Sequence, residues 1–381
     1  MNRRHALQGM LWGTQLLALG PLAGCRGRHP ASPLAGQGIR VDESFAGTIS
    51  QLLERDDLGL HKKLLAHPAL EAIHRHQQLS GRQHESNESL LSQIIERARR
   101  ERPTSRVLDA WTGRKERLID FANASAAYLP PEARFSGTVF LVMGYDIGVA
   151  APPDVVLNVA HEHFQAAPSE LGFYATHEAH HVGFFSRRAP PELRDLNEPE
   201  RLLAIIRYIT QLEGMGVHAA YPLRLAQGSV GHDHDYQVYV DASEARKVAL
   251  RYRELTTKLD GRKTALSEEE VGEILTVMSS GDRIGYQFGA LVASFLERTS
   301  GRARLIESIA NPRLFQIAAT NLLREFELVS ASNRFLEVSL GGSSQARWDQ
   351  PNPPTLKLSH EIAANERSAF HTLTVHQYGV Q

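Results

Sequence analysis

Apolar side chains recur at helical spacing along most of this 381-residue chain. Between residues 45 and 100, for example, Leu90, Leu91, Ile94 and Ile95 fall on one face of a helix. Similar stretches follow later in the chain, at residues 198–222, 241–259, 267–278 and 283–298. The pattern therefore predicts a mainly helical protein with a helical N-terminal layer.

Two short apolar runs differ from this pattern. Residues 138–143 and 154–159 are rich in β-branched side chains and are predicted strands, joined by a linker that contains Gly148 and two prolines. Residues 333–340 are a weaker strand candidate. A helix is predicted directly after the second strand, from about Ser169, which can cap it, to about Phe184. The expected fold class is thus α+β, predominantly α, with a small sheet beside one His-rich helix.

Composition narrows the classes of function. The 42 basic and 43 acidic residues give a net charge of −1, so no basic excess suggests a nucleic-acid partner. Hydrophobic residues make up 42% of the chain, enough for a sizeable core. Cys25 is the single cysteine, which excludes a disulfide within the chain.

The N-terminus reads as an export signal. Arg3 and Arg4 precede a short apolar stretch that ends in Leu22-Ala23-Gly24-Cys25. This ending resembles the bacterial lipobox, which predicts a lipoprotein signal peptide at residues 1–24 and a lipidated Cys25. Residues 25–40 are rich in Gly, Pro and Ser and are a predicted tether. The expected location is the cell envelope, facing the periplasm, at the outer membrane; a plain cleaved signal is the alternative.

The strongest chemical motif is His-Glu-x-x-His at residues 177–181. Residues four apart share a helix face, so His177 and His181 can both reach one metal ion. Imidazole nitrogen suits Zn²⁺, and catalytic zinc sites use three protein ligands and leave one position for water. Glu178 is placed to act as general base on that water. The motif therefore predicts a zinc site with Glu178 as a catalytic residue.

Glu213 is the predicted third ligand. It falls on the apolar stripe of the second long helix, where an unpaired carboxylate is costly and a metal ion offsets the cost. A buried Arg or Lys partner is the alternative. Gly214 and Gly216 would let the two helices approach closely. His218 is the alternative candidate for the third ligand.

This set of residues resembles the gluzincin metallopeptidases, which bind zinc through two His and one Glu. It is similar in particular to uncharacterised bacterial zinc-dependent peptidases, in which a strand precedes the His-Glu-x-x-His helix. In that family a Glu-Gly helix and then a Tyr-x-x-Gly helix follow, matched here by Glu213-Gly214 and by Tyr286 with Gly289. The resemblance covers residues 135–320. The thermolysin-type form of the second helix is absent, because Leu212 precedes Glu213.

The resemblance implies a zincin-like fold and a membrane-anchored zinc metallopeptidase that takes a peptide or protein substrate along its edge strand. It also implies that Tyr286 is a catalytic residue, a donor to the oxyanion of the tetrahedral intermediate; a core tyrosine is the alternative. The expected organisation is an N-terminal helical region at 41–134, a catalytic domain at 135–325 and a C-terminal extension at 326–381. A non-catalytic zinc-binding or scaffold lipoprotein of the envelope is the competing function.

The other histidines are weaker candidates. His180 is expected to pack or to support the ligands. His161 and His163 follow the second strand and are expected to be exposed, although one could face the site. The acidic and His-rich run at residues 232–235 is expected to be solvated.

Overall fold

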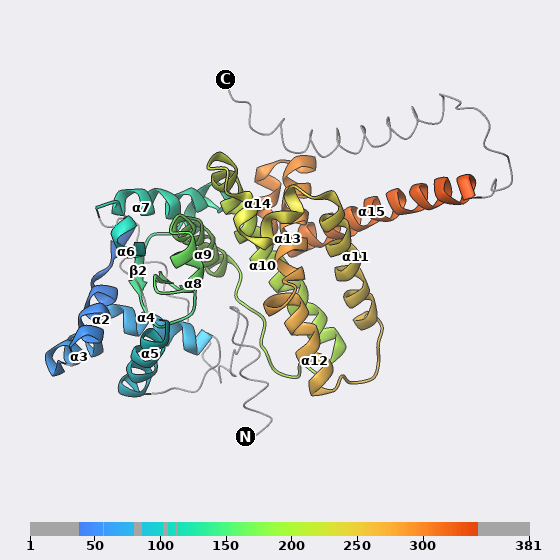
Figure 1. Ribbon diagram of the computed structural model, residues 1–381. Coiled ribbons are helices and arrows are strands. Elements are labelled where there is room, and N and C mark those ends of the chain that lie inside the picture. Colours follow the sequence, from blue (N-terminus) through green and yellow to red (C-terminus); the bar gives the residue numbers. More distant parts are fainter. Residues whose placement is uncertain (1–37, 56, 80–85, 102–105, 112, 342–381) are drawn as a thin grey trace.

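The computed structural model describes residues 38–341 apart from 56, 80–85, 102–105 and 112. The predicted signal peptide and Cys25 lie outside these residues, as does the C-terminal stretch from 342. Within the described part of the chain, no helix is long and apolar enough to cross a membrane. Many helices surround one small sheet (Figure 1), which confirms the predicted α+β class with a predominance of helix.

The sheet has four strands in the order β1-β2-β4-β3. Their bounds are Arg40–Asp42 for β1, Thr138–Val142 for β2, Gly148–Ala151 for β3 and Asp154–Asn158 for β4. The first three strands in this order run parallel, and β3 is an antiparallel edge strand. β2 and β4 confirm the two predicted strands. β3 lies in the segment predicted to be a linker. It is buried along its whole length because α9 and α4 pack against it, which the local sequence does not reveal.

The N-terminal layer confirms the predicted helices. It consists of α2 (Ser44–Glu54), α3 (Leu58–Leu65), α4 (Pro68–Leu79), α5 (Asn87–Glu101), α6 (Arg106–Trp111) and α7 (Lys115–Ala124), followed by the 3₁₀ turns η1 (Ser125–Tyr128) and η2 (Pro131–Ala133). The apolar face predicted for α5 is buried in the core. These helices gather around the sheet on one side of the molecule (Figure 1).

Two long helices run through the middle of the molecule. The chain leaves β4 through the short helix α8 (Glu162–Ala166) and enters α9 (Glu170–Arg187), which packs between the strands β3 and β4 and the next helix, α10 (Pro199–Ala226). Ser169 occupies the N-cap position of α9, but its side chain makes no capping hydrogen bond, contrary to the prediction. α10 continues past Pro222, where the predicted helix ended.

The remaining helices complete the second half of the molecule. They are α11 (Ala242–Leu259), α12 (Glu268–Leu275), α13 (Ile284–Ser300), α14 (Arg302–Ala310) and α15 (Pro312–Gly341), with the short 3₁₀ helices η3 (Val230–His232) and η4 (His234–Tyr239) and the π-helical turn η5 (Thr276–Ser280). Ser267 and Glu270 form a capping box at the start of α12. The strand predicted at residues 333–340 is wrong, because these residues belong to α15.

α10 and α13 cross at two glycines. A Cβ on Gly214 would lie 2.2 Å from the Cα of Gly289, and a Cβ on Gly289 would lie 1.9 Å from the backbone oxygen of Thr210. Only glycine fits at such a distance from a neighbouring backbone. The close contact with α10 is therefore the physical reason for a glycine three residues after Tyr286 on α13.

Candidate metal centre

α9 and α10 bring three possible metal ligands together. His177 and His181 lie one turn apart on α9, and Glu213 faces them from α10. Oε2 of Glu213 lies 3.1 Å from Nε2 of His177 and 3.0 Å from Nε2 of His181. The three atoms lie within 4.8 Å of one another, and all three side chains are buried. Two imidazoles and one carboxylate in this arrangement match the donors that zinc prefers.

The charges in this cluster favour a cation. Burial raises the pKa of Glu213, but the two histidines outweigh it, and the net pKa lies far below its usual value. Burial lowers the pKa of His181, but attraction to Glu213 reverses the effect. The buried carboxylate therefore requires positive charge beside it, which either a proton on an imidazole or a metal ion can supply.

Gly216 lets α10 approach the two histidines. A Cβ at this position would lie 2.8 Å from Cε1 of His181 and 2.9 Å from Cε1 of His177. The predicted role of Gly214 and Gly216 in close helix approach is therefore divided between two partners. Gly214 admits the backbone of α13, whereas Gly216 admits the imidazoles of α9.

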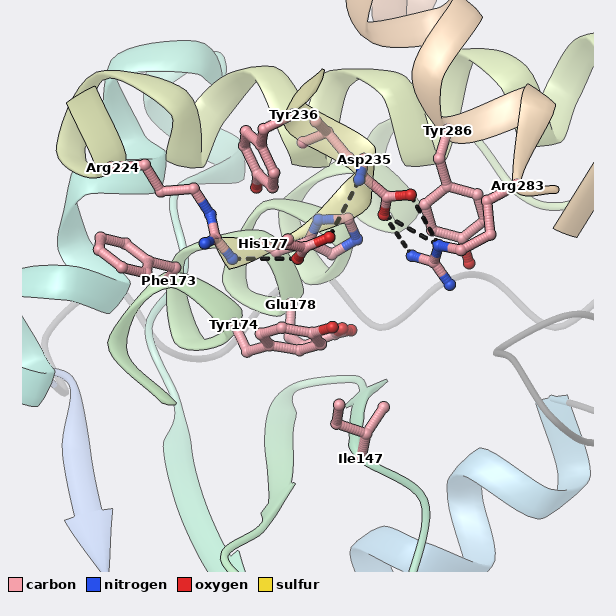
Figure 2. Close-up of a pocket in the computed structure, with 12 residues that line it drawn as sticks. Ile147, Phe173, Tyr174, His177, Glu178, Arg224, Asp235, Tyr236, Arg283 and Tyr286 are labelled. Atoms are coloured by element: carbon pink, nitrogen blue, oxygen red, sulfur yellow. Dashed lines mark hydrogen bonds and ion pairs between the residues drawn. The ribbon is translucent and has the colours of Figure 1, made fainter. Parts of the chain in front are cut away.

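Glu178 lies beside the cluster and beside the edge of the sheet. It lines a narrow pocket together with His177 and Tyr286, all of them buried (Figure 2). A Cβ on Gly148, at the start of β3, would lie 3.5 Å from Cγ of Glu178. The carboxylate is therefore held between the possible metal ligands and the edge strand.

Tyr286 reaches the same pocket from the first turn of α13. Its ring stacks on that of His177, with centroids 6.4 Å apart and an interplanar angle of 13°. Burial raises the pKa of its phenol well above the usual value, and the charge of Glu213 adds to this effect. Tyr286 therefore remains protonated at neutral pH and can donate a hydrogen bond.

Two arginines, Arg224 and Arg283, line the pocket. Arg283 precedes α13 and binds Asp235 of η4 through Nε, at 2.7 Å, and through Nη2, at 2.5 Å. Arg224 of α10 binds Glu170 at the start of α9 and Asp233, with N–O distances of 2.8 and 3.1 Å. These ion pairs fasten the segment around η3 and η4 over the pocket (Figure 2).

The run at residues 232–235 is predicted to be solvated, and this holds for His232 and His234, which are exposed, but not for the two aspartates. Asp235 is 2% exposed and Asp233 is half-buried, and both have arginine partners. His163, Glu170 and Asp233 also form a second group of possible ligand atoms. The guanidinium of Arg224 already bridges Glu170 and Asp233, so this group does not need a metal ion.

The structure removes His218 from the ligand set. Its Nε2 lies 2.6 Å from Oε2 of Glu297 and its Nδ1 lies 2.9 Å from the hydroxyl of Tyr239. Both ring nitrogens are therefore committed away from the cluster. Sequence spacing could not exclude this residue, because Glu297 follows 79 positions later.

The other histidines of α8 and α9 take supporting positions. His180 is completely buried, and burial together with the nearby His181 and His177 lowers its pKa well below the usual value. His161 caps α8 by accepting from the backbone of His163. Nε2 of His163 lies 3.3 Å from Oε2 of Glu170. His161 and His163 are therefore half-buried, whereas the sequence predicted that they are exposed.

A comparison with known families agrees with this geometry. The chain belongs to the family described as "Putative zinc dependent peptidase (DUF5700)", whose model matches residues 61–317. The match includes the three possible ligands, Glu178 and Tyr286. No curated protein and no solved structure matches the chain.

Proposed function

We propose that this protein is a zinc metallopeptidase that hydrolyses peptide bonds, with His177, His181 and Glu213 as its metal ligands. The observation that carries the proposal is the convergence of three buried ligand atoms in a pocket that also contains Glu178. Membership of the zinc-dependent peptidase family supports it. When bound, zinc would polarise a peptide carbonyl and make a water molecule more acidic.

Glu178 is the proposed general base. Its carboxylate lies next in sequence to one ligand and lines the pocket that a substrate must enter. In that position it can take a proton from the attacking water and pass it to the leaving amine. Such a proton transfer commonly contributes about 10²- to 10⁴-fold to the rate.

Tyr286 is the proposed oxyanion donor. Because its phenol keeps its proton at neutral pH, it can donate to the oxygen that gains negative charge in the transition state. Its ring contacts the imidazole of His177 and the guanidinium of Arg283, whose Cζ lies 3.7 Å from the ring centroid. A donor held in place in this way needs little reorganisation during the reaction.

The edge strand β3 gives the substrate a place beside these groups. It ends the sheet on the side where Gly148 approaches Glu178. We propose that an extended peptide passes along this edge, as in other cases of strand addition. The absence of a side chain on Gly148 lets this strand lie close to Tyr174 and Glu178, so that a peptide on its edge would pass near the general base.

The first test is the metal content of the purified protein, compared with His177→Ala and Glu178→Gln. We expect one zinc per chain in the wild type and in Glu178→Gln, and loss of zinc in His177→Ala. Peptide hydrolysis should then be present in the wild type and reduced about 100-fold or more in Glu178→Gln. A wild type that binds no zinc after reconstitution would overturn the proposal.

A zinc-loaded wild type that cleaves no peptide pool would favour the competing function, a non-catalytic zinc-binding or scaffold protein. The catalytic proposal is preferred because Glu178 and Tyr286 both line the pocket, which a purely structural zinc site does not require. We further propose that lipidation of Cys25 tethers the protein to the outer membrane, on the periplasmic side, on the basis of the sequence Leu22-Ala23-Gly24-Cys25.

A further inference from the structure

The two arginines of the pocket differ in what they can reach. Arg224 is 1% exposed, and its guanidinium lies between Glu170 and Asp233 and over the rings of Phe173 and Tyr236, at 4.5 and 4.2 Å. Carboxylates and aromatic rings enclose it. Arg224 therefore holds the pocket together and is out of reach of a ligand.

Arg283 is accessible. Its side chain is 24% exposed, and among the described residues its hydrogen bonds all go to Asp235, through Nε and Nη2. A guanidinium has five N–H donors in one plane, so the donors of Nη1 remain for a ligand. Asp235 fixes the plane in which these donors lie.

The position of Arg283 also relates it to the reacting groups. It lies over the ring of Tyr286, which in turn stacks on His177, and it lines the same pocket as Glu178 (Figure 2). Its backbone is left-handed, with φ at 53°, a conformation that residues other than glycine rarely adopt. Strained residues of this kind concentrate at ligand sites, where the surrounding structure retains them for their placement.

We propose that Arg283 binds a carboxylate of the substrate next to the bond that is cleaved. This inference rests on the proposed peptidase function and names its substrate class. The planar, forked donors of arginine match a carboxylate. An ammonium group of a substrate would instead meet Asp233 and Asp235, both of which are already paired with arginines.

The carboxylate has two possible sources, a free C-terminus or an Asp or Glu side chain. Binding to the zinc-loaded Glu178→Gln protein distinguishes them without relying on turnover. The probes are fluorescent heptapeptide pools of random sequence, prepared with a free or an amidated C-terminus, and matched pools in which Gln and Asn replace Glu and Asp. We expect about 10-fold tighter binding of the pools that carry the recognised carboxylate.

Second-site variants assign this preference to Arg283. In the Glu178→Gln background, Arg283→Lys should remove most of the preference for the carboxylate. Asp235→Asn should weaken the preference without abolishing it, because the guanidinium remains but loses the carboxylate that fixes its plane. Arg304→Lys, an exposed arginine paired with Glu307, is the matched control and should change nothing.

The outcomes separate the two proposals. Equal binding of acid, amide and neutral pools would overturn the role of Arg283, as would an undiminished preference in Arg283→Lys. If Arg283→Lys fails to fold, Arg283→Gln takes its place, and an undiminished preference in that variant overturns the role. Selective binding by Glu178→Gln, together with a wild type that cleaves none of the pools, would instead overturn the peptidase function and leave the carboxylate site standing.

Discussion

Gly216 determines how closely α10 approaches His177 and His181, the proposed ligand histidines. Any larger residue would put a methyl or more against Cε1 of both imidazoles, at 2.8 and 2.9 Å. Those rings are the ends of side chains that can rotate, so the fold can adapt by moving them. The position therefore couples the spacing of two helices directly to the geometry of the possible metal site.

We predict that Gly216→Ala weakens zinc binding by about 10-fold or more while the protein remains folded, because displaced ligands no longer converge on one ion. Competition with a chelator of known affinity measures this change. Gly47→Ala is the control, since a Cβ on that helical glycine has no neighbour within 4 Å. It should leave zinc affinity unchanged, and equal affinity in Gly216→Ala would contradict the geometric argument.

At the residue scale, the sequence predicted those parts of the site that depend on local spacing. His177, Glu178 and His181 share one helix, and the burial of Glu213 follows from the apolar stripe of α10. The ion pair between Arg283 and Asp235 could not be recognised, because the two residues are 48 positions apart. A buried ion pair between distant segments is visible only once the chain has folded.

At the scale of secondary structure elements, periodicity predicted most of the helices and two of the strands correctly. It failed where a neighbouring element determines the outcome. The edge strand β3 is short and pairs antiparallel with β4. Its sequence, Gly148-Val149-Ala150-Ala151, has no alternation of polar and apolar side chains. The strand predicted at residues 333–340 is instead the continuation of a helix that starts at Pro312.

The junction of α10, α13 and α14 depends on one buried carboxylate. Glu297 of α13 accepts from His218 of α10 at 2.6 Å, and Oε1 lies 2.6 Å from Nε of Arg302. Burial raises the pKa of Glu297, but the hydrogen bonds and charges of these two partners outweigh it, and the net pKa lies below the usual value. The ionised carboxylate therefore stabilises the folded state.

The sign of the pH dependence follows from this shift. A lowered pKa in the folded state contributes stability above the unfolded value, near 4.5, and the contribution is lost as the pH falls through the folded value. We predict that Glu297→Gln lowers the free energy of unfolding by about 1–3 kcal/mol at neutral pH. The difference from wild type should shrink below about pH 4 in denaturant titrations. A difference that is constant from pH 7 to pH 3 would contradict this assignment.

At the scale of the whole molecule, the site depends on elements from most of the chain. α9 lies between the sheet and α10, and α13 packs on the other side of α10. The proposed ligands come from α9 and α10, the proposed oxyanion donor comes from α13, and the edge strand β3 belongs to the sheet. The predicted boundary between the N-terminal region and the catalytic domain, at residue 134, falls between β1 and β2, two strands that pair with each other.

The last prediction concerns how the protein is held in the cell. Several acyl chains on Cys25 would anchor it stably, because each buried methylene contributes about 0.8 kcal/mol. In bacteria grown with an alkyne analogue of palmitate, we expect the full-length wild type to be labelled and Cys25→Ala to be unlabelled. Because Cys25 is the single cysteine, no other cysteine of the chain can carry the labelled acyl group. Zinc binding should be equal in the two proteins, because the proposed ligands and the described residues that line the pocket belong to residues 147–286. An unlabelled wild type would contradict the lipoprotein assignment and would leave the proposed zinc chemistry untouched.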